Sequence, residues 1–366
     1  MKITIERAAL QKKLTHVQSV VERRNTIPIL SNVHLEAVNG RLNLTATDLD
    51  IQIVESVEAQ IEIEGKTTVP AQLLLDIVRK LPDGSQVLLD TTEGHMKLVG
   101  GRSRFKLPIL PSEDFPMLAR GDMAHTFTMT TKAMEEALRN TKYAMSSEET
   151  RYYLNGIYLH GAEDGLLAAA TDGHRLARTA VNTGDEPLRG MPNVIMPRKA
   201  VGELAKLIGE FDGEIEISVS PNKIGFDIGS LSLTTKTVDG TFPDYTRVIP
   251  QNNTTIVTAD VKSLAAAIDR VTTIASEKTR AVKFKVENGM ITLSVTSPEN
   301  GTANDEVPCE SNGSIDIGFN AKYLTETLGY ISSENVEMRF SDAAGPVLIV
   351  DLDRPEDVNV LMPMRV

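Results

Sequence analysis

Four side chains in the sequence are of types that hold metal ions or transfer protons. Asp48 and Asp50 lie two residues apart, and Asp172 and His174 repeat this spacing 124 residues later. Carboxylates and imidazoles serve as metal ligands and as general acids or bases. A metal- or phosphate-dependent enzyme that uses these four residues is therefore one hypothesis. Gly173, between Asp172 and His174, favours a structural turn instead.

The other sequence features of catalysis are missing. The sequence has no glycine-rich phosphate-binding loop and no Gly-x-Ser-x-Gly nucleophile motif. None of the six histidines has a second histidine three or four residues away. A single cysteine, Cys309, cannot form a disulfide or a thiolate metal cluster within one chain, and we expect no redox role for it. We therefore predict a protein with no catalytic residues, no cofactor and no metal ion.

The residues around both acidic pairs belong to a repeat. Three apolar positions and one aspartate recur with an offset of 124 residues: Ile3, Leu10, Leu14 and Asp48 correspond to Phe127, Met134, Leu138 and Asp172. A third copy of the apolar positions follows 130 residues after the second: Val257, Leu264 and Ile268. Self-similarity at a fixed spacing indicates that the chain consists of copies of one structural unit.

Each copy contains the same order of structural signals. It begins with an alternating strand and an amphipathic helix, continues through hairpin strands such as those around Asn39-Gly40, and adds a second helix and further hairpins. The six expected helices cover residues 6–24, 71–81, 131–151, 197–209, 260–280 and 320–331. We therefore predict an α+β fold of three domains, with two helices on antiparallel sheets in each, over residues 1–122, 123–251 and 252–366.

Charge separates the predicted helices from the rest of the chain. The net charge is −12, yet the six helix segments together carry +7 and the remainder carries −19. If the helices share one side of the sheets, that side attracts a polyanion. Two alternatives stay open, namely ordinary solvated helix faces and a repeat scaffold that does not bind DNA. Because we find no bilayer-length apolar run and no leader segment, we expect a cytoplasmic protein.

Four segments make the sequence recognisable: residues 151–156, 170–176, 238–245 and 362–365. Together and in this order they closely resemble the bacterial beta sliding clamp family, the processivity subunits of DNA polymerase III. The resemblance implies a head-to-tail homodimer that closes into a ring, with helices lining the central hole and sheets outside. The implied function is to encircle double-stranded DNA, independently of its sequence, and to tether the replicative polymerase without catalysis.

The resemblance also implies a subunit interface between the first repeat of one chain and the third repeat of the other. The matching residues are Arg102 and Arg104 on a basic side, Glu299, Asp305 and Glu306 on an acidic side, and Ile274 at an apolar centre. A head-to-tail contact of this kind closes a ring when its rotation divides the circle.

A second site that the resemblance implies is a pocket between the second and third repeats. It would bind short linear peptides of the polymerase III catalytic subunit, the clamp loader complex, other polymerases, mismatch-repair proteins and ligase. The matching residues are Leu154, Thr171, Gly173, His174, Arg175, Leu176, Pro243, Arg247, Val248, Asn320, Tyr323, Val360, Met362, Pro363, Met364 and Arg365. The sequence departs from the family pattern at Thr279 and at Ala344-Gly345-Pro346, where we expect altered selectivity.

The third implied site contacts DNA through phosphates, as sliding requires. The matching residues are Arg24, Arg79, Lys80, Tyr152, Tyr153, Arg198 and Lys199. A protein with this function is expected at the nucleoid in the cytoplasm.

Overall fold

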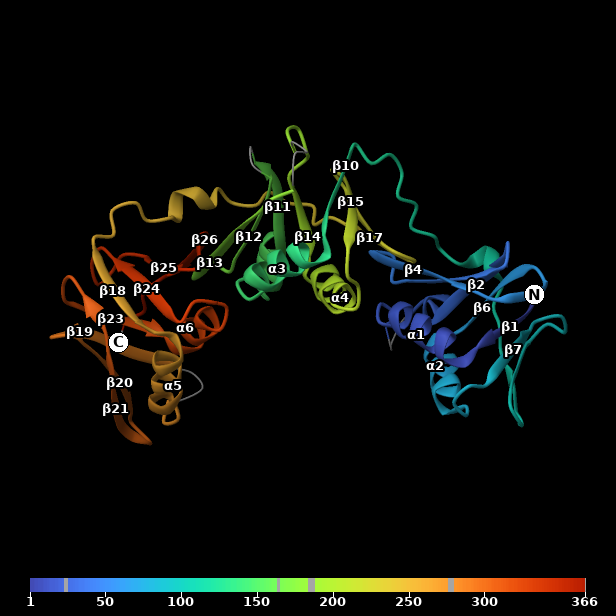
Figure 1. Ribbon diagram of the computed structural model, residues 1–366, viewed down its shortest axis with the longest axis horizontal. Coiled ribbons are helices and arrows are strands. Elements are labelled where there is room, and N and C mark those ends of the chain that lie inside the picture. The colour runs from blue at the N-terminus through green and yellow to red at the C-terminus, as the bar shows by residue number, and fades with distance from the viewer. Residues whose placement is uncertain (23–25, 163–164, 184–187, 276–279, 366) are drawn as a thin grey trace. The chain divides into compact units, whose positions relative to one another are not determined.

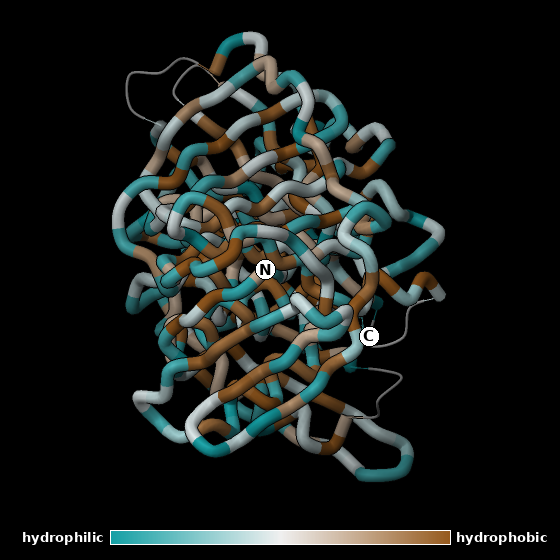
Figure 2. Tube along the Cα trace, turned by 90° about the vertical axis from the view of Figure 1, so that its right-hand side faces the viewer, coloured by the Kyte–Doolittle hydropathy of each residue, from teal (hydrophilic) through white to brown (hydrophobic). Residues whose placement is uncertain are grey.

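The computed structural model describes residues 1–22, 26–162, 165–183, 188–275 and 280–365. Arg24 and Thr279 lie outside these ranges. The chain forms two compact units: unit 1 (Met1–Lys132, Gly190–Pro192 and Lys199–Thr237) and unit 2 (Ala133–Arg189, Asn193–Arg198 and Val238–Val366). The central repeat therefore contributes to both units. No helix in the described ranges is long and apolar enough to cross a membrane, and Figure 2 shows short hydrophobic stretches alternating with hydrophilic ones along the trace.

Unit 1 combines antiparallel sheets with helices packed against them (Figure 1). Its strands are β1 (Lys2–Glu6), β2 (Asn32–Val38), β3 (Arg41–Thr47), β4 (Ile51–Glu58), β5 (Gln60–Ile63), β6 (Gly65–Pro70), β7 (Gln86–Asp90), β8 (Met96–Gly100), β9 (Ser103–Leu107), β10 (His125–Thr130), β15 (Glu214–Ser220), β16 (Lys223–Ile228) and β17 (Leu231–Lys236). They form a five-stranded sheet, β5-β1-β7-β8-β9, and an eight-stranded sheet, β10-β15-β16-β17-β4-β3-β2-β6. Helices α1 (Arg7–Gln18) and α2 (Ala71–Lys80) pack against each other, and α4 (Arg198–Ile208) belongs to this unit from Lys199 onward.

Unit 2 has the same kind of architecture. Its strands are β11 (Gly156–Ala162), β12 (Gly165–Thr171), β13 (Arg175–Val181), β14 (Val194–Pro197), β18 (Thr255–Asp260), β19 (Ala281–Glu287), β20 (Met290–Ser297), β21 (Gly301–Pro308), β22 (Glu310–Ser311), β23 (Ile315–Asn320), β24 (Asn335–Phe340), β25 (Val347–Asp351) and β26 (Arg354–Leu361). They form a nine-stranded sheet, β14-β11-β12-β13-β26-β25-β24-β18-β22, and a four-stranded sheet, β21-β20-β19-β23. Helices α5 (Val261–Thr272) and α6 (Ala321–Leu328) pack against each other, and α3 (Thr131–Lys142) lies in this unit from Ala133 onward.

Apolar stripes on the helices supply the cores, as the periodicity predicts. Leu10 and Leu14 of α1 are fully buried in unit 1, and Leu264 and Ile268 of α5 are fully buried in unit 2. Burial of each such side chain contributes roughly 1.5–3 kcal/mol. The helices are thereby fixed on their sheets.

Three of the predicted helix segments are too long. The segments expected over 6–24, 131–151 and 260–280 end as helices at Gln18, Lys142 and Thr272. Their apolar pattern continues into turns, where Val20 and Met145 are buried without being helical. The apolar pattern reports which residues are buried and does not show whether a buried residue is helical. The predicted helices therefore ran on into the buried turns.

The long sheet of each unit joins strands of consecutive repeats. In unit 1, the last strand of the second repeat, β17, pairs antiparallel with β4 of the first repeat. In unit 2, the last strand of the third repeat, β26, pairs antiparallel with β13 of the second. β4 and β13 occupy the same place in their repeats. The pairing rule is therefore that the last strand of one repeat pairs with this strand of the preceding repeat.

Candidate functional site

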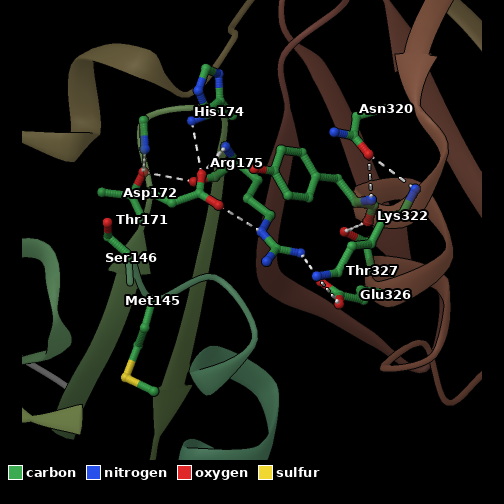
Figure 3. Close-up of polar contacts among 12 residues, drawn as sticks. Met145, Ser146, Thr171, Asp172, His174, Arg175, Asn320, Lys322, Glu326 and Thr327 are labelled. Carbon is green, nitrogen blue, oxygen red and sulfur yellow. Dashed lines mark hydrogen bonds and ion pairs between the residues drawn. The ribbon is translucent and has the colours of Figure 1, made fainter. Parts of the chain in front are cut away.

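The turn after β12 contains the predicted residues Asp172 and His174. The Asp172 carboxylate accepts hydrogen bonds from the backbone N–H groups of His174 (2.9 Å) and Arg175 (3.1 Å), as Figure 3 shows. Gly173 at the corner has a φ of +87°, which L side chains rarely adopt. Asp172 is therefore a structural residue of this turn, as the glycine indicated.

Unit 1 has the same kind of turn after β3. The Asp48 carboxylate accepts N–H bonds from Asp50 (2.9 Å) and Ile51 (2.8 Å), and its second oxygen accepts a bond from the Lys199 ammonium. Asp50 forms an ion pair with Lys236 at 2.9 Å. Within the described ranges, no three His, Cys, Asp or Glu side chains are grouped so that they could hold a metal ion. The carboxylates of the enzyme hypothesis thus have structural partners.

Arg175 lies almost fully buried behind the turn in unit 2. Its guanidinium forms ion pairs with Asp172 (3.0 Å) and Glu326 (2.5 Å). It also lies over the rings of Tyr143, at 5.3 Å, and Tyr323, at 4.3 Å. The guanidinium is already paired with carboxylates of the protein. The part of Arg175 that can contribute to a binding surface is therefore its carbon chain.

An apolar cavity of about 160 Å³ lies in unit 2 beside this turn. Nine predicted pocket residues line it: Leu154, Thr171, Gly173, Arg175, Leu176, Pro243, Val248, Val360 and Met362. Asp244 and Tyr245 also line the cavity, and the sequence analysis missed both. They directly follow Pro243 within the segment 238–245, and that position is the signal that could have identified them.

Aromatic packing fixes the wall of this cavity. The ring of Tyr158 stacks on Phe242 with centroids 4.7 Å apart, and the Tyr245 hydroxyl is 2.8 Å from Nε2 of His160. Burial raises the pKa of the Tyr245 hydroxyl and lowers the pKa of the His160 imidazole. Both groups are therefore neutral near pH 7, and the Tyr245 hydroxyl can donate to the imidazole. This arrangement holds η4 (Tyr245–Val248) against the end of the sheet.

The tail after β26 completes the cavity. The backbone N–H of Met362 donates to the carbonyl of His174 at 2.8 Å, and the Met362 side chain is 39% exposed. A methionine in this position presents a flexible apolar surface that can adapt to different ligands.

Seven predicted pocket residues do not line the apolar cavity: His174, Arg247, Asn320, Tyr323, Pro363, Met364 and Arg365. The imidazole of His174 stacks on the ring of Tyr323 with centroids 6.1 Å apart. Asn320 accepts backbone N–H bonds at the start of α6 (Figure 3), and Arg247 forms an ion pair with Asp244 at 2.8 Å. A second cavity is lined by Pro363, Met364 and Arg365. It also includes Ala344, which belongs to the segment Ala344-Gly345-Pro346 that departs from the family pattern.

The predicted DNA-contacting residues differ in exposure and in whether their polar groups already have partners within the protein. Arg79 and Lys80 are exposed in the last turn of α2. Tyr152 is 54% exposed in η3 (Glu149–Leu154), with its ring edge-to-face against Tyr153 at 5.8 Å. Arg79, Lys80 and Tyr152 are therefore available on the surfaces of their own units, whereas Tyr153 is half-buried and packs against the core beside the apolar cavity.

Arg198 and Lys199 are instead engaged within the protein. The Arg198 guanidinium donates to the carbonyls of Met145 (2.9 Å) and Ser146 (2.8 Å). The Lys199 ammonium forms ion pairs with Asp48 and, at 3.1 Å, with Glu22. Two carboxylates offset the charge of Lys199, which weakens its attraction for phosphate.

The predicted interface residues lie on two edge strands or next to them. Arg102 and Arg104 are exposed at the start of β9, which pairs in the described residues only with β8. Glu306 is exposed on β21, whereas Asp305 faces α5 and accepts a bond from Arg270 at 2.7 Å. β21 pairs in the described part of the chain only with β20.

Ile274 and Glu299 lie near β21. Ile274 is half-buried, and it packs against the core of unit 2 rather than standing free. Its carbonyl accepts a hydrogen bond from Asn300 at 3.1 Å. Glu299 is exposed in the turn between β20 and β21. The apolar contribution of Ile274 to a contact surface is therefore partial.

Three family models match consecutive parts of the chain. The DNA polymerase III beta subunit N-terminal domain matches residues 1–119, the central domain residues 128–244 and the C-terminal domain residues 246–365. With the antiparallel sheets and paired helices described above, they define the α+β fold of a three-domain DNA clamp.

Full-length relatives identify the family. The beta sliding clamp of Caulobacter vibrioides (strain NA1000 / CB15N) is 48% identical, and that of Escherichia coli (strain K12) is 35% identical, over 100% of both chains in each case. A crystal structure of a Bartonella birtlesii sliding clamp bound to griselimycin has a TM-score of 0.97 at 46% identity, and each chain is covered to 100%. A Caulobacter crescentus clamp structure, with PEG bound to a putative beta-motif tethering region, has a TM-score of 0.97 at 47% identity and covers 100% of this chain and 99% of its own. The chain belongs to the beta sliding clamp family, the non-catalytic subunits that confer processivity on DNA polymerase III.

Proposed function

We propose that two copies of the chain join head to tail, with β9 of one copy pairing with β21 of the other, and so close a ring around duplex DNA. The supporting observation is the pairing rule between repeats. The last strand of the second repeat pairs with β4, and the last strand of the third repeat pairs with β13. Two strands of the described chain have no partner of this kind. They are β9, the last strand of the first repeat, and β21, which occupies the place of β4 in the third repeat. These two edges are complementary in a second copy.

The hairpin that precedes the joining strand supports the same pairing. Ile228 pairs with Leu231 across a two-residue turn, and Gly100 pairs with Ser103 across a turn of equal length. The first turn residues, Gly229 and Gly101, have φ values of +59° and +57°. Arg102 therefore occupies the place of Ser230 in this hairpin.

Ser230 shows what a residue in that place can reach. Its hydroxyl donates to the carboxylate of Glu55, the fifth residue of β4, at 2.9 Å. Asp305 is the fifth residue of β21. By this equivalence the Arg102 guanidinium of one copy reaches the Asp305 carboxylate of the other, a charge-assisted contact at the centre of the interface.

Charge on the helices supports the enclosure of DNA. The six helices of the described ranges carry 14 Lys and Arg against six Asp and Glu. The chain in total has 38 basic and 50 acidic residues, so the rest of it is strongly acidic. A ring with the helices inside attracts phosphates to its hole and repels them from its outer surface.

The apolar cavity beside the Asp172 turn is the proposed docking site for partners. Its walls of Leu176, Val248, Val360 and Met362 fit the apolar end of a short linear peptide. The proposed sources of such peptides are the polymerase III catalytic subunit, the clamp loader complex, other polymerases, mismatch-repair proteins and ligase. The three repeats would act as domains over residues 1–122, 123–251 and 252–366, at the nucleoid in the bacterial cytoplasm.

Sedimentation velocity tests the interface directly. We expect a species of twice 39.9 kDa for the parent protein at micromolar concentration. Reversal of one charge of a desolvated pair costs roughly 2–5 kcal/mol, so Arg102→Glu should raise the dimer Kd by at least about thirtyfold. Lys97→Glu is the matched control, because Lys97 is exposed on the inner strand β8 of the same sheet. A monomeric parent protein, or equal effects of the two variants, would contradict the proposed pairing.

Topological retention tests the ring. Protein loaded on nicked circular DNA should stay bound through a salt wash and should be released when the DNA is linearised. Equal retention on circular and linear DNA would contradict enclosure.

A further inference from the structure

Unit 1 contains a turn equivalent to the one beside the apolar cavity of unit 2, and so has a place equivalent to that cavity. Gln52 corresponds to Leu176 by the offset of 124 residues. Both pair with the last strand of the following repeat, Gln52 with Thr234 and Leu176 with Val360. Thr234 therefore corresponds to Val360. Two apolar residues that line the cavity in unit 2 thus have polar counterparts in unit 1.

The linker that crosses this place is also equivalent in the two units. It comprises residues 112–120 in unit 1 and 239–247 in unit 2, and each contains a Phe-Pro pair. Phe115 packs against His34 with ring centroids 5.4 Å apart. Phe242 stacks on Tyr158, which lies 124 residues after His34. The correspondences that follow are Leu118 with Tyr245 and Arg120 with Arg247.

Gln52 binds the linker of unit 1 directly. Its side chain is buried, and its amide oxygen accepts a hydrogen bond from the backbone N–H of Leu118 at 2.8 Å. Its amide nitrogen donates to the carbonyl of the same residue at 3.4 Å. Leu176 has no group that can form such bonds, and it lines the cavity together with Tyr245. The glutamine therefore holds the linker against β4.

Arg120 covers the neighbouring part of the sheet. Its guanidinium donates to the hydroxyls of Thr234 (3.0 Å) and Ser232 (2.7 Å) and forms a bidentate ion pair with Asp227, at 2.5 and 2.8 Å. The Arg120 side chain is 28% exposed. The equivalent side chain of Arg247 is 82% exposed and pairs with a carboxylate of its own linker. The same residue type thus points onto the sheet in unit 1 and away from it in unit 2.

A glycine makes room for the guanidinium in unit 1. Gly225 pairs with Thr234 in the sheet. Leu348 pairs with Val360 in the same way, so it occupies the place of Gly225 in unit 2. A Cβ atom at Gly225 would lie 2.9 Å from Cζ of Arg120, so the arginine would have to shift. In unit 2, Leu348 packs against the buried residues around the cavity. A leucine in this place is therefore incompatible with an inward arginine.

We propose that Gln52, Arg120 and Gly225 are specificity determinants that close, in unit 1, the place equivalent to the peptide cavity. An apolar anchor could enter there only by breaking the bonds of Gln52 and Arg120 and leaving their polar groups unpaired. Each chain then docks one partner peptide, in unit 2, although the repeat provides a similar place twice. The inference rests on the proposed docking of partner peptides in the apolar cavity.

Isothermal titration calorimetry counts the peptides that each chain binds. The probe is a short synthetic peptide that carries a glutamine, a leucine and an apolar terminal residue, and we expect one peptide per chain on the dimeric parent protein. The variant Gln52→Leu/Gly225→Leu gives unit 1 the residues that unit 2 has in these places, and it should bind a second peptide. Because Thr234 remains where unit 2 has an apolar wall, the second Kd should be about ten- to a hundredfold higher than the first.

Deletion of residues 362–366 assigns the two binding events to their units. Met362 is part of the wall of the cavity in unit 2. In the parent protein, the deletion should remove the single binding event. In Gln52→Leu/Gly225→Leu, it should remove the tight event and leave the weak one.

Gln60→Leu is the matched control variant. It adds a leucine to β5, where Gln60 is exposed in the same unit, and it should bind one peptide per chain. Circular dichroism and dimer mass check that each variant is folded. Gln52→Leu/Arg120→Ser removes the closing groups without inserting a side chain at position 225. It should also bind a second peptide, even if Gly225→Leu prevents folding.

The outcomes separate the two proposals. One peptide per chain on every folded variant, two peptides per chain on the parent, or a second event that disappears with residues 362–366 would overturn the closure alone. A second peptide on Gln60→Leu would do the same. Absence of binding by the parent would overturn docking in the apolar cavity, and the closure with it, because unit 2 would then have no open site.

Discussion

Glu55 is the buried acceptor that joins α1 to the long sheet of unit 1, and its replacement by glutamine should destabilise that unit. The Glu55 side chain is fully buried. Its carboxylate lies 2.5 Å from Nδ1 of His16 and accepts bonds from the Lys13 ammonium and the Ser230 hydroxyl, both at 2.9 Å. A neutral amide in this place leaves the Lys13 ammonium without its buried counter-charge.

The size of the loss follows from this burial. Removing one partner of a buried ion pair costs roughly 3–5 kcal/mol. Each kcal/mol lowers Tm by about 2–4 °C in a unit of this size, so Glu55→Gln should lower Tm by roughly 6–20 °C at pH 7. Differential scanning calorimetry measures the shift, and hydrogen exchange should show faster opening of the β4 and β17 backbone. Glu58→Gln on the same strand is the control, because the Glu58 side chain is 91% exposed and its loss should cost under about 1 kcal/mol.

The effect should depend on pH with a definite sign. Burial acts to raise the pKa of Glu55, but the hydrogen bonds from His16 and Lys13 outweigh it and leave the pKa below its ordinary value. A carboxyl whose pKa is lowered by folding stabilises the protein above the unfolded pKa, about 4.3, and loses that contribution as the pH falls through the folded value. The difference in Tm between parent and Glu55→Gln should therefore be full at pH 7 and shrink below about pH 4.3. A shift of less than 2 °C at pH 7, or a difference unchanged down to pH 3, would refute the reasoning.

Two further predictions concern ligands. Deletion of residues 362–366 should abolish binding of a short synthetic peptide that carries a glutamine, a leucine and an apolar terminal residue, while circular dichroism and dimer mass stay unchanged, because β26 ends at Leu361 and keeps its partners β13 and β25. Loss of the folded state would show that the tail belongs to the core. Lys80→Gln should lower the salt dependence of DNA binding by about one unit of slope in a log–log titration, because it removes one phosphate contact. An unchanged slope would remove Lys80 from the DNA surface.

The repeat made the two aspartate turns predictable from the sequence. Asp48 and Asp172 share one place in their repeats, and in both cases the carboxylate accepts N–H bonds from the two and three residues that follow. These bonds are local, so sequence spacing determines them. The pocket residues came from the resemblance instead, and nine of them line the apolar cavity. Seven of these nine lie in the four recognisable segments, whereas Val248 and Val360 lie outside them.

Partners distant in sequence were not predictable. Lys199 pairs with Asp48, which lies 151 residues earlier, and Arg175 pairs with Glu326, which lies 151 residues later. Such pairs depend on which strands meet in the folded sheets, and an exposed or buried lysine has the same local sequence pattern. The resemblance implied a phosphate contact for Lys199, and nothing in its local sequence indicated that its ammonium pairs with Asp48 and Glu22.

The joints between repeats differ in strength in a way that bears on how the proposed ring opens. A joint is the place where the last strand of one repeat meets the preceding repeat. The preceding repeat contributes the tenth residue of its first helix and the fifth residue of its strand β4, β13 or β21 to the joint. These residues are His16 and Glu55 in the first repeat, Asn140 and Thr179 in the second, and Arg270 and Asp305 in the third. In the first two repeats a residue of the following repeat completes the joint: Ser230 bonds to Glu55, and Asp357 accepts from both Asn140 (3.1 Å) and Thr179 (2.5 Å).

The third joint is incomplete within one chain and more accessible to water. Glu55 and Thr179 are fully buried, whereas the side chains of Arg270 and Asp305 are 61% and 25% exposed. These exposures belong to a single chain, and a second copy that places Arg102 here would cover the pair. The backbone between repeats links the two joints within the chain covalently, whereas only non-covalent contacts would hold β9 of one copy to β21 of the other. We therefore expect the proposed ring to open between β9 and β21. A clamp that must admit DNA and then retain it needs this order of strengths.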